Sequence, residues 1–135
     1  MSSLIPEKAL DLLQRPIVIT LVTQMPDGYP QATPVWFSFD GELIWVNTEA
    51  KRQKAQNMNE RPQVTILSVD PENPYRYMEI RGDIVEVTED GAVDHINALS
   101  ERYFGRKDYY QNNPEGRHKE TRVIYKIKPV VVNAN

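Results

Sequence analysis

The chain has 135 residues, a formal net charge of −3, 40% hydrophobic residues and no cysteine. This length suits one domain with one buried core, and the lack of cysteine excludes disulfides, thiolate nucleophiles, iron–sulfur clusters and cysteine zinc sites. An acidic chain lacks the basic surface that sequence-independent nucleic-acid binding needs, and no stretch has the length of a membrane span. We therefore expect a single domain over residues 1–135 in the cytoplasm, since no signal peptide is recognisable, without a nucleic-acid or membrane partner.

The first part of the chain predicts one helix and three strands. Residues 6–14 begin with a proline and place their leucines mostly on one face, which indicates a short helix. Runs at 17–23, 31–39 and 43–46 predict strands, and the Asp-Gly pairs between them favour hairpin turns. The strand at 43–46 is apolar on both faces, which is typical of a barrel wall with something packed outside it.

The second part predicts two more helices, three more strands and a polar loop, in the order helix 49–59, strand 64–69, strand 75–87, helix 90–104, loop 106–121 and strand 122–132. Gly82 lies inside the long strand and indicates a bulge or a barrel corner. The polar loop is a candidate lid. Together these elements predict a mainly β fold with peripheral helices.

Several common site motifs are absent. The sequence has no Gly-x-Gly-x-x-Gly after a strand, no phosphate-binding loop signature and no Gly-x-Ser-x-Gly elbow. Its two histidines, His95 and His118, are far apart, and we interpret both as surface side chains. We expect no metal site.

The start of the second helix is rich in positive charge. Thr48 is a candidate N-cap, and Lys51, Arg52 and Lys54 follow within a turn and a half. Cations are unfavourable at the positive end of a helix dipole unless an anion compensates them, and a bound phosphate would do so. A solvated basic face explains the same charges equally well from residue chemistry alone.

Aromatic residues give a second indication. Pro34 removes a backbone donor from its strand, which indicates an edge, and Trp36 would flank the exposed backbone. Tyr75 and Tyr77 alternate onto one face of their strand. They could lie against a planar ligand, although core packing is the more common role of such pairs.

The order of these motifs resembles the pyridoxamine-phosphate-oxidase-like split-barrel superfamily, and in particular its deazaflavin-dependent reductases. The matching motifs are Asp27-Gly28-x-Pro30, Pro34-Val35-Trp36-Phe37, Asp40-Gly41, Arg52-x-Lys54-x-x-Asn57-Met58-x-x-x-Pro62 and Tyr75-x-Tyr77-x-x-x-x-Gly82. Their order and spacing extend over nearly the whole chain.

The resemblance implies a six- to seven-stranded antiparallel split β-barrel that forms a homodimer with two cofactor sites at the interface. It assigns the cofactor phosphate to Asn47, Thr48, Arg52, Lys54 and Asn57, the ring to Pro34, Val35 and Trp36, and contacts from the partner subunit to Tyr75 and Tyr77. Trp36, Tyr77, Tyr109 and Tyr110 are candidates for substrate contacts. No side chain is assigned as an acid or base.

The resemblance also implies a choice of cofactor. Oxidases of the pyridoxamine phosphate type carry an arginine and a lysine on the second strand, where this chain has Thr33 and Ser38. This difference favours F420 over FMN and makes vitamin B6 oxidation a poor fit. We therefore expect an F420-dependent oxidoreductase that transfers a hydride to or from a small organic molecule. The alternatives are an FMN-dependent oxidoreductase and a non-catalytic cofactor- or tetrapyrrole-binding protein.

Overall fold

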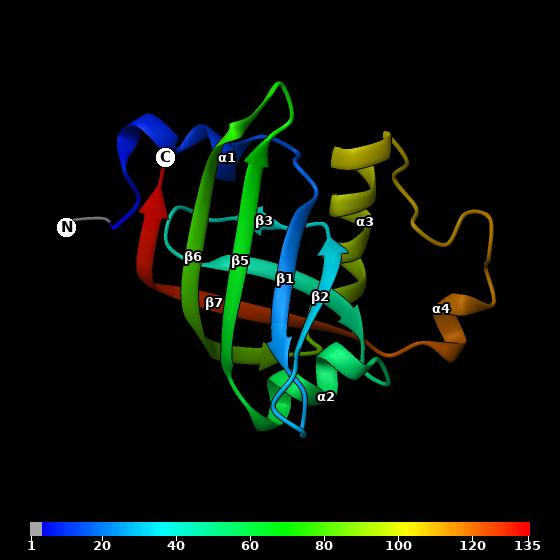
Figure 1. Ribbon diagram of the computed structural model, residues 1–135. Coiled ribbons are helices and arrows are strands. Elements are labelled where there is room, and N and C mark those ends of the chain that lie inside the picture. Colours follow the sequence, from blue (N-terminus) through cyan, green and yellow to red (C-terminus); the bar gives the residue numbers. More distant parts are fainter. Residues whose placement is uncertain (1–3) are drawn as a thin grey trace.

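The computed structural model describes residues 4–135, which form a seven-stranded sheet curled into an open barrel with helices around it (Figure 1). The mainly β fold class is thus confirmed. In chain order the elements are the 3₁₀ turn η1 (Glu7–Ala9), α1 (Asp11–Gln14), β1 (Ile19–Gln24), β2 (Pro30–Val35), β3 (Ser38–Phe39), β4 (Ile44–Glu49), α2 (Gln53–Glu60), β5 (Gln63–Asp70), β6 (Asn73–Thr88), α3 (Ala92–Phe104), α4 (Gly116–Lys119) and β7 (Arg122–Ala134).

The sheet has the order β2-β1-β5-β6-β7-β4-β3, with every neighbouring pair antiparallel. The single strand predicted over 31–39 is wrong, because the chain divides there into β2, which pairs with β1, and β3, which pairs with β4. Trp36 and Phe37 form the crossover between the two. Since β2 and β3 lie at opposite ends of the strand order, this crossover leaves a split between β2 and β4.

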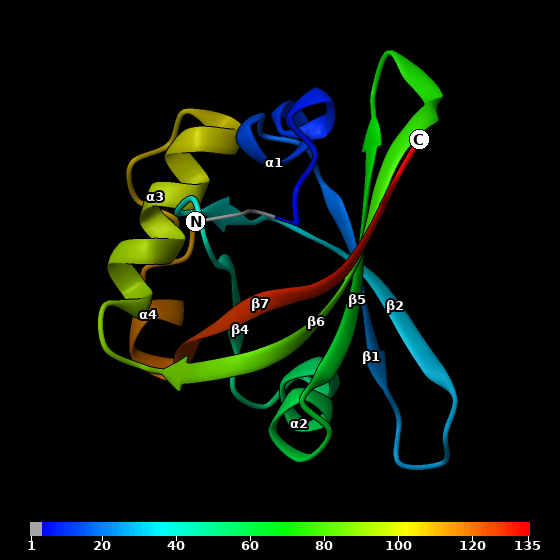
Figure 2. The same ribbon diagram turned by 90° about the vertical axis from the view of Figure 1, so that its left-hand side faces the viewer.

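The core fills the inside of the curled sheet. Strands β1, β4 and β5 each bury every second residue, as their alternating sequence predicts. Leu12 and Leu13 of α1 join this cluster, as do Ala55 and Met58 of α2. Figure 2 shows these two helices at opposite ends of the barrel. Each fully buried leucine stabilises the fold by roughly 1.5–3 kcal/mol.

Strands β6 and β7 bend together at Gly82, where the strand register shifts between Arg81 and Gly82. A Cβ atom on the buried Gly82 would lie only 2.7 Å from the Lys128 carbonyl oxygen and from Cγ2 of Ile127. The predicted bulge at this glycine is therefore confirmed. The bend lets both strands contribute to both halves of the barrel (Figure 2).

The predicted helix cap at Thr48 is wrong. Thr48 lies within β4 opposite Val123, and the ladder between β4 and β7 continues to Glu49 opposite Arg122. Sheet pairing thus takes these residues into the strand, and α2 begins at Gln53 with Arg52 as an N-cap that forms no side-chain cap. The predicted polar loop is mostly turns, with α4 as one short helix.

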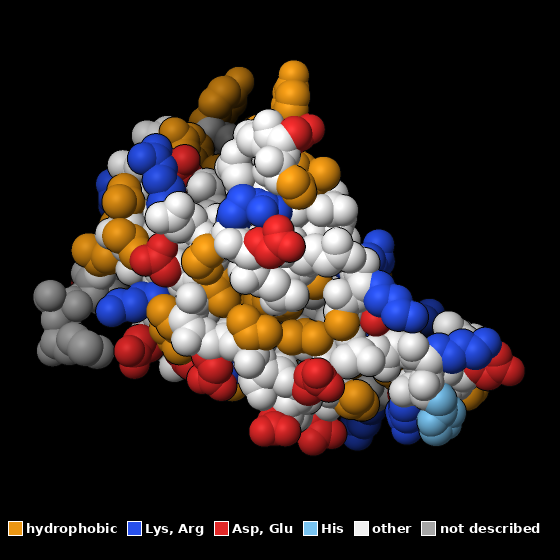
Figure 3. Space-filling model, turned by 90° about the horizontal axis from the view of Figure 1, so that it is seen from below, with side chains coloured by type: hydrophobic (Ala, Val, Ile, Leu, Met, Phe, Trp, Pro, Cys, Tyr) orange, Lys and Arg blue, Asp and Glu red, His pale blue; other side chains and the backbone are white. Residues whose placement is uncertain are grey.

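The surface mixes both signs of charge. Viewed from the α2 end, several basic side chains lie toward the side that carries α4, with acidic ones among them and over the rest of the face (Figure 3). Within residues 4–135, none of the helices combines the length and apolar character needed to cross a bilayer.

Candidate cofactor pocket

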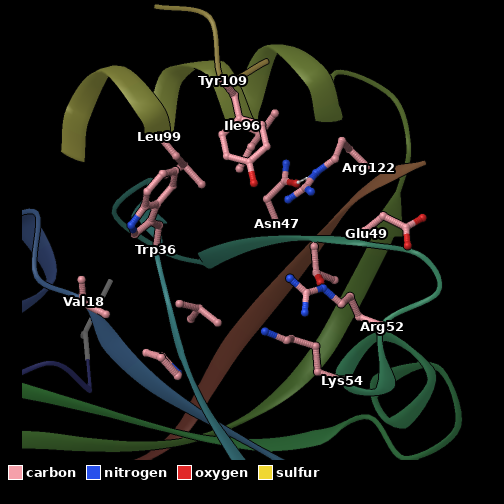
Figure 4. A pocket seen from close by; sticks show the side chains of 13 residues that line it. Val18, Trp36, Asn47, Glu49, Arg52, Lys54, Ile96, Leu99, Tyr109 and Arg122 are labelled. Carbon is pink, nitrogen blue, oxygen red and sulfur yellow. Dashed lines mark hydrogen bonds between the residues drawn. The ribbon is translucent and has the colours of Figure 1, made fainter. Parts of the chain in front are cut away.

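A pocket of about 320 Å³ opens at the split between β2 and β4 (Figure 4). Helix α3 covers one side of it, and the start of α2 borders the other. Its lining comes from elements far apart in the chain: Val18, Pro34, Val35, Trp36, Asn47, Thr48, Glu49, Arg52, Lys54, Ile96, Leu99, Tyr109 and Arg122. The barrel topology is thus what brings the pocket together.

The β2 wall offers free backbone groups. Pro34 lies opposite Thr20 of β1 and has no N–H to donate, as expected for a strand position whose backbone faces away from its neighbour. The other side of β2 pairs with no strand in the described chain. This edge of β2 can therefore hydrogen-bond a planar ligand with polar atoms on its rim.

Positive charge without a partner gathers at the α2 end. The side chains of Arg52 and Lys54 form no hydrogen bond or ion pair with the rest of residues 4–135. The carboxylate of Glu49 instead accepts hydrogen bonds from the backbone N–H groups of Lys51, at 3.1 Å, and Thr121, at 3.2 Å. Burial, followed by repulsion from Arg52 and Arg122, lowers the pKa of Lys54. An anion bound here would relieve this repulsion.

Arg122 is a pocket residue that the sequence did not indicate. Its side chain is 8% exposed, and its Nε–H donates to Asn47 Oδ1 at 2.9 Å while Nη1 donates to Glu120 at 3.2 Å. The guanidinium carbon lies 5.3 Å from the centre of the Tyr109 ring. The alternating pattern that predicted the strand β7 does not indicate that its first residue, Arg122, lines a pocket.

A hydrogen-bond network fixes the orientation of Asn47. Its Nδ2 donates to the Ala92 carbonyl at 2.8 Å and to His95 Nδ1 at 3.1 Å, while its Oδ1 accepts from Arg122. The Asn47 amide is therefore already used within the protein. Its place in the pocket wall serves to hold Arg122.

His95 is not the surface side chain that we expected. Because its Nδ1 accepts from Asn47, its proton lies on Nε2, which faces Ser38 Oγ at 2.9 Å. Burial, together with the nearby Arg122 and Lys126, lowers the pKa of His95 to about 4. Residues 4–135 contain no cluster of acidic and histidine side chains that could hold a metal ion.

An aromatic cluster fixes the crossover that carries Trp36. The Trp36 ring stacks on Tyr103 of α3 at 5.3 Å between ring centres and contacts Tyr109 edge-on at 6.1 Å. The Tyr103 hydroxyl donates to the Ile17 carbonyl at 2.7 Å and accepts from the Phe37 N–H at 3.2 Å. Helix α3 thus positions both Trp36 and the end of β2.

Most of the predicted cofactor residues meet in this one pocket, namely Pro34, Val35, Trp36, Asn47, Thr48, Arg52 and Lys54. Lys51 is exposed outside it, and Asn57 is buried with its amide bonded to Thr23 at 3.0 Å and Gln53 at 2.8 Å, where it holds α2 against β1.

Three predicted tyrosines lie outside the pocket. Tyr75 and Tyr77 are exposed on β6, so their predicted contact with a cofactor requires a second chain. Tyr110, predicted to contact the substrate, is buried behind Tyr109 and donates its hydroxyl to Glu120 at 2.7 Å.

Comparisons with known proteins agree with this fold. A solved F420 reductase is 34% identical over 96% of this chain and 98% of its own, with a TM-score of 0.84. A conserved hypothetical protein from Mycobacterium tuberculosis is 28% identical over 96% of this chain and 84% of its own, with a TM-score of 0.76. General Stress Protein 26 from Bacillus anthracis, 21% identical over 95% and 91%, shares the fold with a TM-score of 0.68.

No curated protein matches the sequence. The family model of pyridoxamine 5'-phosphate oxidase matches residues 5–135. This match extends over nearly the whole chain, and the split barrel described above is the fold expected from it. The chain therefore belongs to the pyridoxamine 5'-phosphate oxidase family.

Proposed function

We propose that this protein binds F420 and catalyses hydride transfer to or from a small organic substrate. The observation that carries the proposal is the pair of unpartnered cations, Arg52 and Lys54, at one end of a pocket whose wall is the free edge of β2. A phosphate at one end and a flat, polar-rimmed ring along the edge satisfy both features. The 34% identity to an F420 reductase supports the choice of cofactor.

The residues present fit such a cofactor. Arg52 can grip a phosphate with two N–H groups, Lys54 adds a point charge, and the Thr48 hydroxyl adds a hydrogen bond. The β2 backbone around Pro34 and Val35 would align the ring. When bound, a reduced deazaflavin supplies a hydride from its central ring. The protein's part is to hold the ring and to exclude water with the apolar side chains of α3.

FMN is the second candidate cofactor, because Arg52 and Lys54 suit its phosphate as well. The second-strand positions favour it less. Thr33 and Ser38 are uncharged and add no cation to the pocket; within residues 4–135, Thr33 Oγ1 is buried without a hydrogen-bond partner and Ser38 Oγ is bonded to His95. Non-catalytic binding of a cofactor or tetrapyrrole is the third candidate.

We further propose a homodimer formed through the outer face of β1, β5 and β6. None of the helices within residues 4–135 covers this face (Figure 2), and apolar side chains of these strands and of the neighbouring β7 line it: Val22, Leu67, Val69, Tyr77 and Val131. Pro34 of the pocket wall lies beside this face, opposite Thr20. A partner there would border the pocket, which fits the predicted role of Tyr75 and Tyr77.

A competition and turnover experiment tests the proposed function. Purified protein is titrated with F420 and with FMN, and the loaded protein is then mixed with a redox dye. We expect F420 to bind at least about tenfold more tightly than FMN and its reduced form to pass electrons to the dye. Tighter binding of FMN than of F420 would indicate an FMN-dependent oxidoreductase. Binding of a cofactor without electron transfer to the dye would indicate a non-catalytic binding protein. Binding of neither cofactor would refute the proposal.

A further inference from the structure

We infer that Arg122 forms a carboxylate-binding subsite in the pocket, so that the substrate is a carboxylic acid with an apolar body. This inference rests on the proposed function, in which Arg52 and Lys54 hold the cofactor phosphate. It gives a role to Arg122, the nearly buried cation that the proposed phosphate site does not use.

Arg122 lies across β4 from the proposed phosphate site, near enough to Lys54 for the two charges to repel each other. Figure 4 shows it beside Asn47 and Tyr109 on the α3 side of β4, whereas Arg52 and Lys54 approach from the α2 side. One phosphate bound between Arg52 and Lys54 therefore leaves Arg122 facing a different part of the pocket. Two separate positive ends suit ligands with two separate anionic groups.

The guanidinium of Arg122 is held in place but not fully used. Its Nε–H donates to Asn47 Oδ1, and one N–H of Nη1 donates to Glu120. Its Nη2 forms no hydrogen bond with residues 4–135. Asn47 is itself fixed by Ala92 and His95. A rigid, nearly buried guanidinium with free donors is well prepared to bind a carboxylate.

The nearest carboxylate does not fully neutralise Arg122. Glu120 also accepts the Tyr110 hydroxyl at 2.7 Å, so its negative charge is shared between two donors. Burial and repulsion from Arg52 and Arg122 lower the pKa of Lys54. The pocket thus keeps excess positive charge inside a chain whose net charge is −3.

The wall next to Arg122 is apolar. Ile96 and Leu99 are buried on α3, and Trp36 and Tyr109 present aromatic rings beside them. Ile96 and Leu99 have no hydrogen-bonding groups, and the Tyr109 hydroxyl adds a single polar group to this part of the wall, which therefore favours hydrocarbon or aromatic surface. The combination of this wall with one cation selects an apolar acid.

The test uses trans-cinnamate and its uncharged amide, cinnamamide, which share an apolar body and differ in charge. Ligand-observed NMR titration of the cofactor-free full chain measures both affinities in the wild type and in Arg122→Gln and Arg122→Lys. Arg117→Gln is the matched control. Arg117 lies on α4, just before β7 in the chain, but outside the pocket, where it forms an ion pair with Asp108 at 2.7 Å.

We expect the wild type and Arg117→Gln to bind cinnamate about tenfold more tightly than cinnamamide. Arg122→Gln should lose this preference while keeping its affinity for cinnamamide, and Arg122→Lys should keep only part of it. If Arg122→Gln does not fold, Arg122→Lys carries the test. Equal binding of both probes by the wild type, or an unchanged preference in the Arg122 variants, would overturn the inference.

Titration of the Arg122 variants with F420 separates this inference from the proposed function. F420 affinity within about twofold of the wild type supports a substrate subsite. A large loss of F420 affinity assigns Arg122 to the cofactor, which overturns the inference and leaves the function standing. If the wild type binds no cofactor, the function fails, and the cinnamate preference still reports on Arg122.

Discussion

His95 links three elements around the pocket and does so as a neutral ring. It bonds Ser38 of β3 and Asn47 of β4 from its place on α3. Its folded pKa of about 4 lies below the ordinary 6.5, so the unfolded chain binds the additional proton between these values. The stability from this group is therefore present above pH 6.5 and is lost as the pH falls toward 4.

We predict that His95→Gln reduces the pH dependence of stability. Between pH 7.5 and pH 4.5, the wild type should lose about 2–3 kcal/mol of stability at His95, because the half-buried ring must then be charged. Urea unfolding of both proteins at the two pH values measures this difference, and the carboxylates common to both cancel. An identical pH dependence in the two proteins would contradict the neutral His95 ring.

Tyr103 provides a second prediction at the residue scale. Tyr103→Phe removes the hydroxyl that bridges the Ile17 carbonyl and the Phe37 N–H but keeps the ring beneath Trp36. We expect a loss of about 1–3 kcal/mol, since two half-buried backbone groups lose their partner. Tyr109→Phe is the control and should change stability by less than about 0.5 kcal/mol. Equal stability losses in a denaturant titration would argue against this bridge.

Charged residues differ in how far the sequence reveals their place. The cations at the start of the predicted second helix made Arg52 and Lys54 candidates, the family resemblance assigned them to a phosphate, and both lie at the pocket. Arg122 was missed because a single arginine in an alternating strand resembles an exposed one. The Glu49–Arg122 pairing between β4 and β7 brings it inward, and such long-range pairing has no local sequence signal.

Among the elements, the β6–β7 bend depends on the absence of a side chain at Gly82. We predict that Gly82→Ala destabilises the fold by about 1–3 kcal/mol, because the new methyl group would meet the Lys128 carbonyl, and backbone cannot move as a flexible side chain can. Thermal unfolding followed by circular dichroism measures the change. A melting temperature within about 1–2 degrees of that of the wild type would show that the bend accommodates a methyl group and would contradict this prediction.

Element boundaries were predicted well where local patterning decides them and poorly where pairing does. The helix over 90–104 closely matches α3, because apolar spacing and Gly105 define it. The break between β2 and β3 was missed, since Val35-Trp36-Phe37 is a continuous apolar run. The strand ladder also extends β4 through Thr48, where capping chemistry alone predicted a helix start.

For the whole molecule, the proposed dimer is open to a direct test. Leu67→Glu places a charge in the middle of the outer face of β5, where burial against a second chain would be costly. We expect the wild type to sediment at twice the chain mass of 15.6 kDa and Leu67→Glu as a monomer. Val93→Glu on α3 is the control and should stay dimeric. A wild type that sediments as a monomer would contradict the dimer.

At this scale the sequence was most informative about architecture. The strand patterns predicted a mainly β fold and the resemblance implied a split barrel, and the fold has that form because β2 and β3 separate at Trp36. The pocket follows from this separation. Its chemistry is less predictable, because the wall combines residues from Val18, just before β1, to Arg122 at the start of β7.

The central claim is that Arg52 and Lys54 hold the phosphate of a deazaflavin cofactor, and an F420 fluorescence titration of the double variant Arg52→Ala/Lys54→Ala tests it most directly. Lys51→Ala is the control, since it removes an adjacent cation that does not line the pocket. We predict that the double variant weakens F420 binding by about a hundredfold or more, as expected for two charge-assisted contacts, while Lys51→Ala changes it less than about twofold. Equal F420 affinity in the wild type and a folded double variant would contradict the claim.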